Sequence, residues 1–437
     1  MVKLSEEEST RRIERRISYL TGLGVKDPQK VLDANHGWGY SVQYMENHVK
    51  YFEVFGISSV PSLIDNCPKV LSPGIDCIGE KLLYLEEMGI KDVCSVVEKT
   101  PEIIGTISIE NMKEHFQYLK DLGIEDVGGF IERRPNFLTR SPETSKNIVT
   151  YLESLGVKNV KRIVTKLPSI FETSIPNMEE KVSYFRDLGI DDIGKVIEKL
   201  PQSIGTLSIS NLKKHVGYLE GLGVRNIAKT VVRNPKVLSF SIENMNKHVI
   251  YLESVGVRKD RIGKIVEKTP GLLGSVSIEN MRVHVEYLEG LGIRDVGKVI
   301  ERTQGVLTYS IQRMEKSVKY LKDAGFNDIG SLIQSFSSIL CLNIENNLKP
   351  TVEFLIDVGY DVADMEKFPM SVLFSLEQRI KPRFAFIGNE RPTNRSLNVI
   401  LGPGDYNFAT RICGYPDENQ YQVFKMQFLE EQASVTT

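Results

Sequence analysis

Five pairs of basic residues, each spaced four positions apart, are the residues of this chain whose type and spacing could do chemistry. In a helix, side chains at i and i+4 lie on one face, so each pair would form a patch of positive charge. Like charges at that spacing destabilise a helix slightly, so five repetitions in register predict an anionic ligand. The pairs are Arg162 with Lys166, Lys195 with Lys199, Lys229 with Arg233, Lys264 with Lys268, and Lys298 with Arg302.

A solvated helix face is the alternative interpretation of these pairs. The second member of each pair falls in the last turn of its expected helix, where a cation favours the helix dipole. Glu198, Glu267 and Glu301 stand beside three of these second members and partly offset their charge. The first members fall in the first turn, where a cation is disfavoured. The helix dipole therefore explains only the second members of the pairs, whereas phosphate binding explains both the first and the second members.

The elements that position these pairs belong to an internal repeat. The phrase Tyr-Leu-x-x-Leu-Gly or a close variant occurs eleven times, with its glycines 32 to 36 residues apart. A period of this size is typical of one supersecondary unit that buries its apolar face on its neighbours. The glycines are Gly24, Gly56, Gly89, Gly123, Gly156, Gly189, Gly223, Gly256, Gly292, Gly325 and Gly359.

Residues 108–138 show how one copy is built. An amphipathic first helix is expected after a capping serine, Ser108, because apolar residues from Met112 to Leu122 recur mostly at three- and four-residue steps. Gly123 then suits the left-handed position that ends a helix. An Asp or Asn three residues later, here Asp126, predicts the cap of a short second helix. Proline usually follows twelve residues after the glycine, and predicts the start of a very short third helix. Each copy should therefore contain three helices.

The copy that follows Gly256 departs from this pattern. Its proline, Pro270, is delayed by a two-residue insertion. Gln304 and Ser337 replace the proline in two other copies, so its role there must be weaker. The first copy departs most, as expected for the end of a solenoid.

The repeat resembles the mitochondrial transcription termination factor (mTERF) family. The resemblance rests on the Tyr-Leu-x-x-Leu-Gly phrase and on the basic residue two before proline with an aliphatic residue three after it, as in residues 233–238. The segments NLKPTVEFL and LEQRIKPRF are similar to the usual ending of that family. The resemblance implies a curved all-α solenoid, right- or left-handed, of about ten to eleven three-helix repeats. It also implies DNA or RNA binding in mitochondria or chloroplasts, in transcription termination, transcript processing or other steps of expression.

Net charge gives mixed evidence about a polyanionic partner. The whole chain carries −2, although nucleic-acid-binding domains are usually basic. Residues 141–310 hold 25 Lys and Arg against 19 Asp and Glu, which is +6, and the remainder holds 30 against 38, which is −8. The central copies are thus the basic ones. We expect repeats over residues 1–378 and a capping segment with an acidic tail over 379–437, in which Arg379, Lys381 and Arg383 either extend the basic row or cap the last helix.

Other functional classes find little support in the sequence. Five histidines stand three residues before the repeat tyrosine, which favours packing or hydrogen bonding between repeats over catalysis or metal binding: His48, His115, His215, His248 and His284. No catalytic grouping, metal-ligand spacing or phosphate loop is found, so we expect no enzyme, no metal and no cofactor. The five scattered cysteines fit a reducing compartment, and no apolar run is long enough to cross a membrane.

The first residues resemble neither a secretory signal nor a transit peptide, so we expect either that no targeting segment exists or that it has been removed. We expect a monomer that binds double-stranded DNA or RNA through the phosphate backbone, with proteins of the organellar expression machinery as further partners. The alternative is a helical-repeat scaffold for protein–protein interaction, for example in organellar ribosome assembly.

Overall fold

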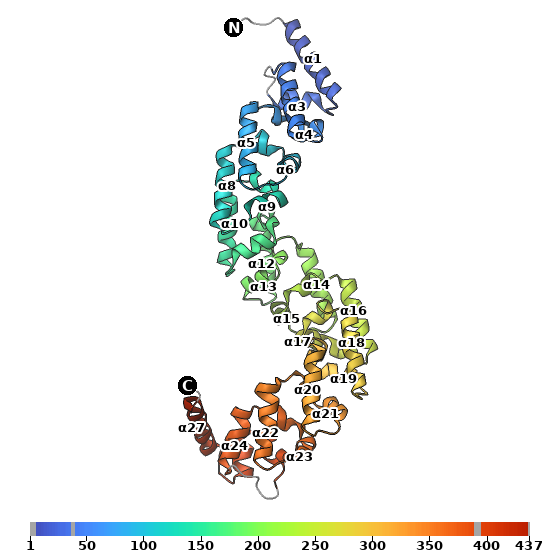
Figure 1. Ribbon diagram of the computed structural model, residues 1–437, viewed down its shortest axis with the longest axis vertical. Helices are drawn as coiled ribbons and strands as arrows, with labels where there is room; N and C mark the ends of the chain where they lie inside the picture. The colour runs from blue at the N-terminus through green and yellow to red at the C-terminus, as the bar shows by residue number, and fades with distance from the viewer. Residues whose placement is uncertain (1–5, 36–39, 389–394, 436–437) are drawn as a thin grey trace. The chain divides into compact units, whose positions relative to one another are not determined.

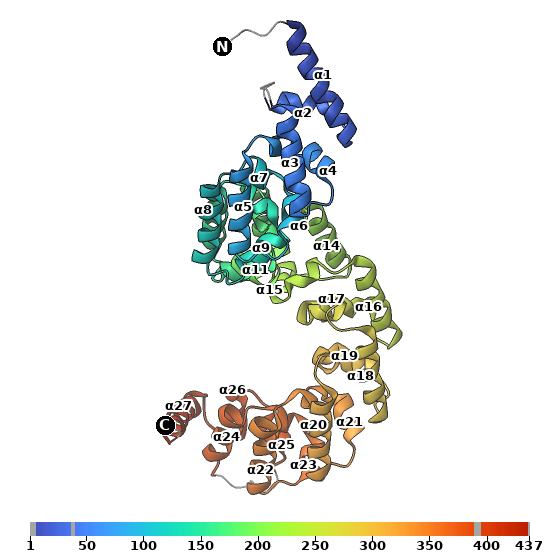
Figure 2. The same cartoon turned by 45° about the horizontal axis from the view of Figure 1, so that its top comes forward.

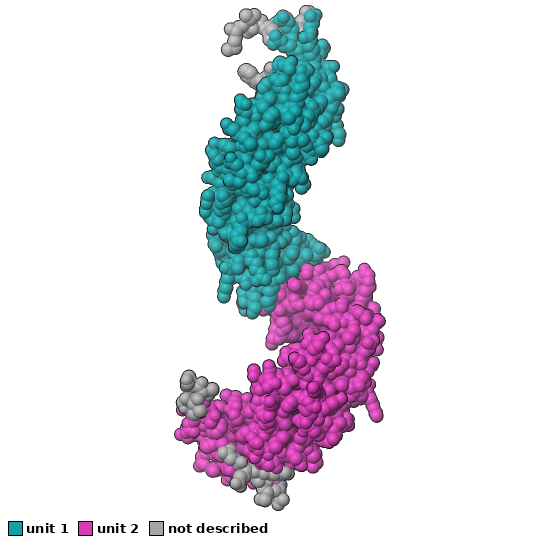
Figure 3. Space-filling model, viewed as in Figure 1, with its two compact units in different colours: residues 1–212 teal, residues 213–437 magenta. Residues whose placement is uncertain are grey.

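In the computed structural model, which describes residues 6–35, 40–388 and 395–435, the described chain is helical and contains no strand (Figure 1). The chain forms two compact units, residues 1–212 and 213–437, coloured separately in Figure 3. The helical repeat continues through both units, so the all-α repeat architecture predicted from the sequence is confirmed.

Each copy begins with a long first helix. Its apolar stripe is buried, as with Met112 and Leu119, and most of these helices open on a serine that caps the first turn. The first helices are α1 (Glu6–Leu23), α3 (Val42–Phe55), α5 (Ile75–Glu87), α8 (Ile109–Asp121), α10 (Pro142–Ser154), α12 (Ile175–Asp187), α14 (Ile209–Gly221), α16 (Ile242–Ser254), α18 (Ile278–Gly290), α20 (Ile311–Asp323) and α22 (Lys349–Asp357).

The repeat glycine ends the first helix in the predicted way. Gly123 has a φ of +84°, and its backbone N–H donates to Lys120 O over 2.8 Å. The next N–H, of Ile124, reaches back to Leu119 O over 2.9 Å. These bonds satisfy carbonyl groups at the helix end and require a left-handed residue between them. All eleven repeat glycines share the positive φ.

A short second helix follows each glycine, in most copies with the expected Asp or Asn as its cap. Asp192, for example, accepts a hydrogen bond from the Lys195 backbone over 3.1 Å. The second helices are α2 (Pro28–Ala34), α4 (Val60–Asn66), α6 (Val93–Lys99), α9 (Val127–Arg133), α11 (Val160–Lys166), α13 (Ile193–Lys199), α15 (Ile227–Arg233), α17 (Lys259–Lys268), α19 (Val296–Arg302), α21 (Ile329–Ser335) and α23 (Val362–Lys367).

The third helices are single turns that mostly begin at the repeat proline. They are η1 (Pro68–Leu71), α7 (Glu102–Gly105), η2 (Pro135–Thr139), η3 (Pro168–Glu172), η4 (Pro201–Ser203), η5 (Pro235–Leu238), η6 (Pro270–Leu273), η7 (Gln304–Leu307), η8 (Ser337–Cys341) and η10 (Pro369–Leu373). The copies that lack proline still form this turn, so the anchoring apolar residue, such as Leu307, suffices. In the first unit neighbouring first helices pack on each other, as α5 does on α8, and second helices do so in both units, as α6 does on α9 and α15 on α17 (Figure 2).

The repeat histidines have the structural role predicted for them. His48 places Nδ1 2.9 Å from Tyr44 O and Nε2 2.8 Å from Pro73 O, and His248 and His284 repeat this arrangement. Lys81 and Lys181 take the same position in other copies and donate to equivalent carbonyls. This position therefore ties the first helix to the segment that follows the third.

The C-terminal segment continues the helical packing beyond residue 378. That boundary falls inside a π-helical turn, η11 (Leu376–Ile380), which follows an earlier one, η9 (Ile344–Leu348), at the same place before the next helix. The remaining elements are α24 (Lys381–Phe386), α25 (Leu397–Leu401), α26 (Asp405–Asn407), η12 (Phe408–Ile412) and α27 (Asn419–Val435). Phe386 of α24 packs on Tyr421 and Phe424 of α27, so this segment closes the core of the last copies.

Candidate nucleic-acid interface

All ten basic residues of the five predicted pairs are exposed in the structure. In α11, α13, α15 and α19 the first member is the third helical residue, beside the capping Asp or Asn. Each helix buries its apolar residues on the opposite side, as with Val196 and Ile197 of α13. The pairs therefore occupy one solvent-facing position that recurs from copy to copy.

The first members make no contact that would explain their charge. Among the described residues, the side chains of Arg162, Lys195, Lys229, Lys264 and Lys298 form no hydrogen bond or ion pair with another protein group. Four of them lie in the first turn, where a cation opposes the helix dipole, and an unpartnered cation there gains nothing in return from the protein. These five side chains are thus available to an external anion.

Some second members have a structural contact as well, as two arginines show. Arg302 Nη1 donates to Gln334 O over 2.8 Å, and Arg233 Nη1 donates to Glu267 O. Both acceptors are carbonyls near the end of the next second helix, where backbone oxygens lack helical partners. The helix-end interpretation thus holds for these two arginines.

The acidic residues beside the second members do not act as their counter-ions. Each instead accepts a hydrogen bond from the backbone N–H that lies two residues after the preceding glycine, so that consecutive copies are joined. Glu198 accepts from Lys158 N over 2.7 Å, and Glu301 accepts from Arg258 N over 2.9 Å. We call this the bridging position; it is occupied by Asp65, Glu98, Glu132, Glu198, Glu267, Glu301, Gln334 and Glu366.

Sequence reasoning missed the bridging position because its partner lies about forty residues away. The signal was present, since an acidic residue one position before the second basic residue recurs in most copies. Thr165 and Val232 replace it at two positions and carry no carboxylate. The recurrence of this residue is therefore structural.

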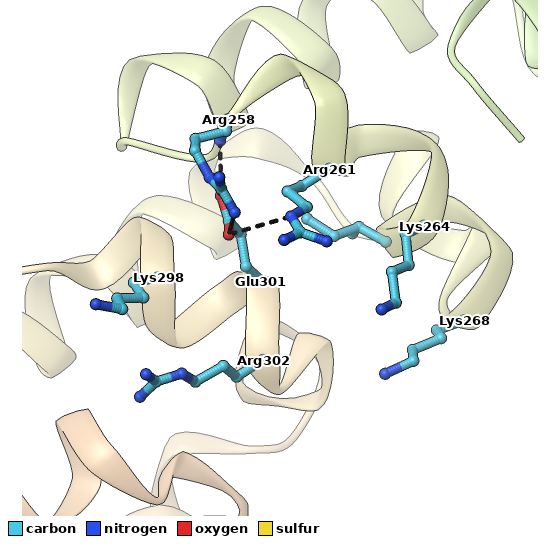
Figure 4. Close-up of a pocket in the computed structure, with 8 residues that line it drawn as sticks. Arg258, Arg261, Lys264, Lys268, Lys298, Glu301 and Arg302 are labelled. Atoms are coloured by element: carbon cyan, nitrogen blue, oxygen red, sulfur yellow. Dashed lines mark hydrogen bonds and ion pairs between the residues drawn. The ribbon is translucent and has the colours of Figure 1, made fainter.

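The densest group of cations lies in a groove of about 410 Å³ between α17 and α19 (Figure 4). The two-residue insertion seen in the sequence lengthens α17 to 10 residues, against 7 in α19. Arg258 takes the place of the usual acidic cap, and Arg261 becomes the third helical residue, so that Lys264 lies in the middle of the helix. Six cations line the groove: Arg258, Arg261, Lys264, Lys268, Lys298 and Arg302.

Glu301 is the carboxylate that lines this groove, and arginines hold it. Arg258 Nη2 lies 3.0 Å from Glu301 Oε2, and Arg261 Nε lies 4.0 Å from the same oxygen. The hydrogen bond from Arg258 keeps the pKa of Glu301 below its ordinary value, although burial acts in the opposite direction. Six cations against one carboxylate leave an excess of five positive charges.

The three basic residues near the C-terminus have structural roles. Arg383 is fully buried, and its Nη2 lies 2.7 Å from Asp405 Oδ1. Arg379 donates to Leu401 O and Pro403 O, at the end of α25. Lys381 pairs with Glu377 at 2.6 Å. Arg379 thus caps the end of α25, while Arg383 and Lys381 are held in ion pairs.

Comparison with known families gives one match. The family described as mTERF matches residues 2–152 and 117–409. A comparison with curated proteins finds no match for the chain. No helix among the described residues has the length and apolar character needed to span a membrane.

Proposed function

The chain belongs to the mTERF family, a helical-repeat family that binds nucleic acid and regulates organellar gene expression, and we propose that this member grips phosphates through its second helices. One cation pair on each of α11, α13, α15, α17 and α19 would contact the backbone of double-stranded DNA or of RNA. Mitochondria or chloroplasts are the proposed location, and transcription termination or transcript processing the proposed step.

The observation that supports the proposal best is that, in the part of the chain that the structure describes, the first members of the pairs have no protein group to neutralise their charge. They are exposed, lack protein partners among the described residues, and recur at one position of the repeat. When these cations neutralise phosphates, condensed counterions are released from the nucleic acid, and this release supplies free energy of binding. Contacts of this kind give affinity and register, while sequence preference requires contacts with bases or sensitivity to nucleic-acid shape.

A charge-matched pair of variants tests the proposal. The first carries Lys195→Gln, Lys229→Gln, Lys264→Gln and Lys298→Gln, which removes four first members. The control carries Lys120→Gln, Lys214→Gln, Lys319→Gln and Lys322→Gln, four exposed lysines on first helices. Filter binding to duplex DNA and to single-stranded RNA should show a loss on the order of a hundredfold for the first variant and a small loss for the control. Equal losses would mean that only net charge matters and that the second helices are not the site.

A further inference from the structure

The groove between α17 and α19 differs in charge from the groove between α21 and α23. The second groove has about 330 Å³ and is lined by one cation, Lys367, together with Asp328 and Glu366. The first has about 410 Å³ and is lined by six cations and Glu301. Both lie between the second helices of neighbouring copies, so the repeat supplies the cavity. The charge of each groove is therefore set by the residues that its two copies place along it.

Four of the six cations belong to the repeated pairs, and the other two are arginines that lie outside them. A phosphate backbone that follows the second helices would meet one basic pair per copy. Arg258 and Arg261 add two further cations at this copy alone, and both lie at the start of α17, where the helix dipole disfavours them. Arg258 uses Nε and Nη2 on Glu301, so its Nη1 remains for a ligand. The Nε of Arg261 donates no hydrogen bond within the described protein.

The ligand that this groove fits is denser in charge than a phosphodiester strand. A strand carries one negative charge per nucleotide, and its neighbouring phosphates are separated by a sugar. Phosphates joined by a bridging oxygen lie closer together and carry more charge in a small volume. Arginine forks bind phosphate oxygens in pairs, and lysines supply point charges. The cavity volume is in the range of small-ligand sites, about 300–1,000 Å³.

We propose that the α17–α19 groove binds linked phosphates, such as the triphosphate of an RNA 5′ end or of a free nucleotide. The inference rests on the proposed function in one respect, because four of the six cations are shared with the proposed phosphate-binding row. It assigns to this copy a separate role, the recognition of a chain end or of a nucleotide rather than of any backbone phosphate.

The test uses the full chain and two kinds of probe. Calorimetry with inorganic tripolyphosphate and with GTP measures binding of free linked phosphates. Filter binding compares two single-stranded RNAs of one sequence, one with a 5′-triphosphate and one with a 5′-hydroxyl. Arg261→Gln and Lys264→Gln each remove one groove cation, and Lys195→Gln is the control, since it removes a proposed backbone contact in another copy. Circular dichroism establishes that all variants are folded.

The expected result is one tripolyphosphate per chain and about tenfold tighter binding of the 5′-triphosphate RNA, with each groove variant weakening tripolyphosphate binding about tenfold. Lys195→Gln should weaken both RNAs equally and leave tripolyphosphate binding unchanged. If GTP binds and the two RNAs bind equally, the site takes free nucleotides. If tripolyphosphate binds while neither RNA nor duplex DNA does, the groove assignment stands and the proposed function fails. Tripolyphosphate binding that is absent, or that both groove variants leave unchanged, overturns the inference.

Discussion

Arg258 and Glu301 are joined across two consecutive copies by three hydrogen bonds, one from the backbone and two from the guanidinium. The Arg258 backbone N–H donates to Glu301 Oε1 over 2.9 Å, and its Nη2 donates to Oε2 over 3.0 Å. The same carboxylate therefore holds two copies together and lowers the positive charge of the α17–α19 groove. Stability and ligand affinity should respond to this residue in opposite directions.

We predict that Glu301→Ala lowers the free energy of unfolding by about 1–3 kcal/mol, because three donors of Arg258 lose their charged acceptor. Glu301→Gln should cost less, since an amide oxygen can still accept; Gln334 does so for Arg294 N at 3.3 Å. Both variants should bind polyanions more tightly than the unchanged chain. Urea denaturation and tripolyphosphate titration measure the two effects. A loss of affinity in Glu301→Gln would show that this carboxylate orders the groove rather than weakening it.

Two glycines of neighbouring helices should respond to alanine in opposite ways. Gly297 in α19 packs against the backbone of Gly256, and a methyl group there would come within 2.8 Å of Gly256 Cα. Gly290 in α18 has nothing within 4 Å. Gly297→Ala should destabilise the chain by about 2 kcal/mol despite better helix propensity, whereas Gly290→Ala should stabilise it by about 0.5–1 kcal/mol. Thermal unfolding compares them; equal shifts would refute this packing.

Asp405 should be essential for the C-terminal segment. It holds the buried Arg383 at 2.7 Å and Lys425 at 3.0 Å. Burial would raise the pKa of Asp405, but its hydrogen bonds to these two cations outweigh that effect and lower it. Removing one partner of a buried pair costs about 3–5 kcal/mol, so Asp405→Ala should release residues 376–435 first on denaturation. Limited proteolysis measures that release. Glu377→Gln, at an exposed residue, is the control. If Asp405→Ala and Glu377→Gln were cleaved at the same rate, Asp405 would not be essential for the C-terminal segment.

Alkaline stability should be limited by the repeat tyrosines. Burial, assisted by a nearby glutamate in each case, raises the pKa of Tyr118, Tyr287 and Tyr320 to about 12. Unfolded tyrosines ionise near pH 10, so between pH 10 and about 12 the unfolded chain binds fewer protons, and stability must fall as pH rises. The stability that these tyrosines contribute is fully present below pH 10 and is lost as the pH rises toward 12. Denaturation midpoints across this range should fall less steeply in Tyr287→Phe, and an unchanged slope would show that this tyrosine is not protected.

The sequence predicted the repeat well because its determinants are local. A glycine with positive φ, an Asp cap and a proline each act within a few residues, and the structure places them as expected, as at Gly123 and Asp192. The π-turns before α22 and α24 were not anticipated, because no local pattern predicted an extra residue in the turn.

The candidate site was predicted only in part, since its remaining features depend on distant partners. The role of Glu301 depends on Arg258, which belongs to the preceding copy. The insertion before Pro270 was visible, but its effect on Arg258 and Arg261 requires the geometry of the lengthened α17. Arg383 resembled a surface cation in sequence, and only its contact with Asp405 shows that it is buried.

The salt dependence of nucleic-acid binding tests the central claim most directly. The logarithm of the association constant of the unchanged chain should fall linearly with the logarithm of salt concentration. In the variant with Lys195→Gln, Lys229→Gln, Lys264→Gln and Lys298→Gln, the slope should be shallower by about three to four, because each lost phosphate contact removes about 0.7–0.9. The first-helix control variant should keep the original slope. An unchanged slope in the second-helix variant would show that these cations do not meet the phosphates.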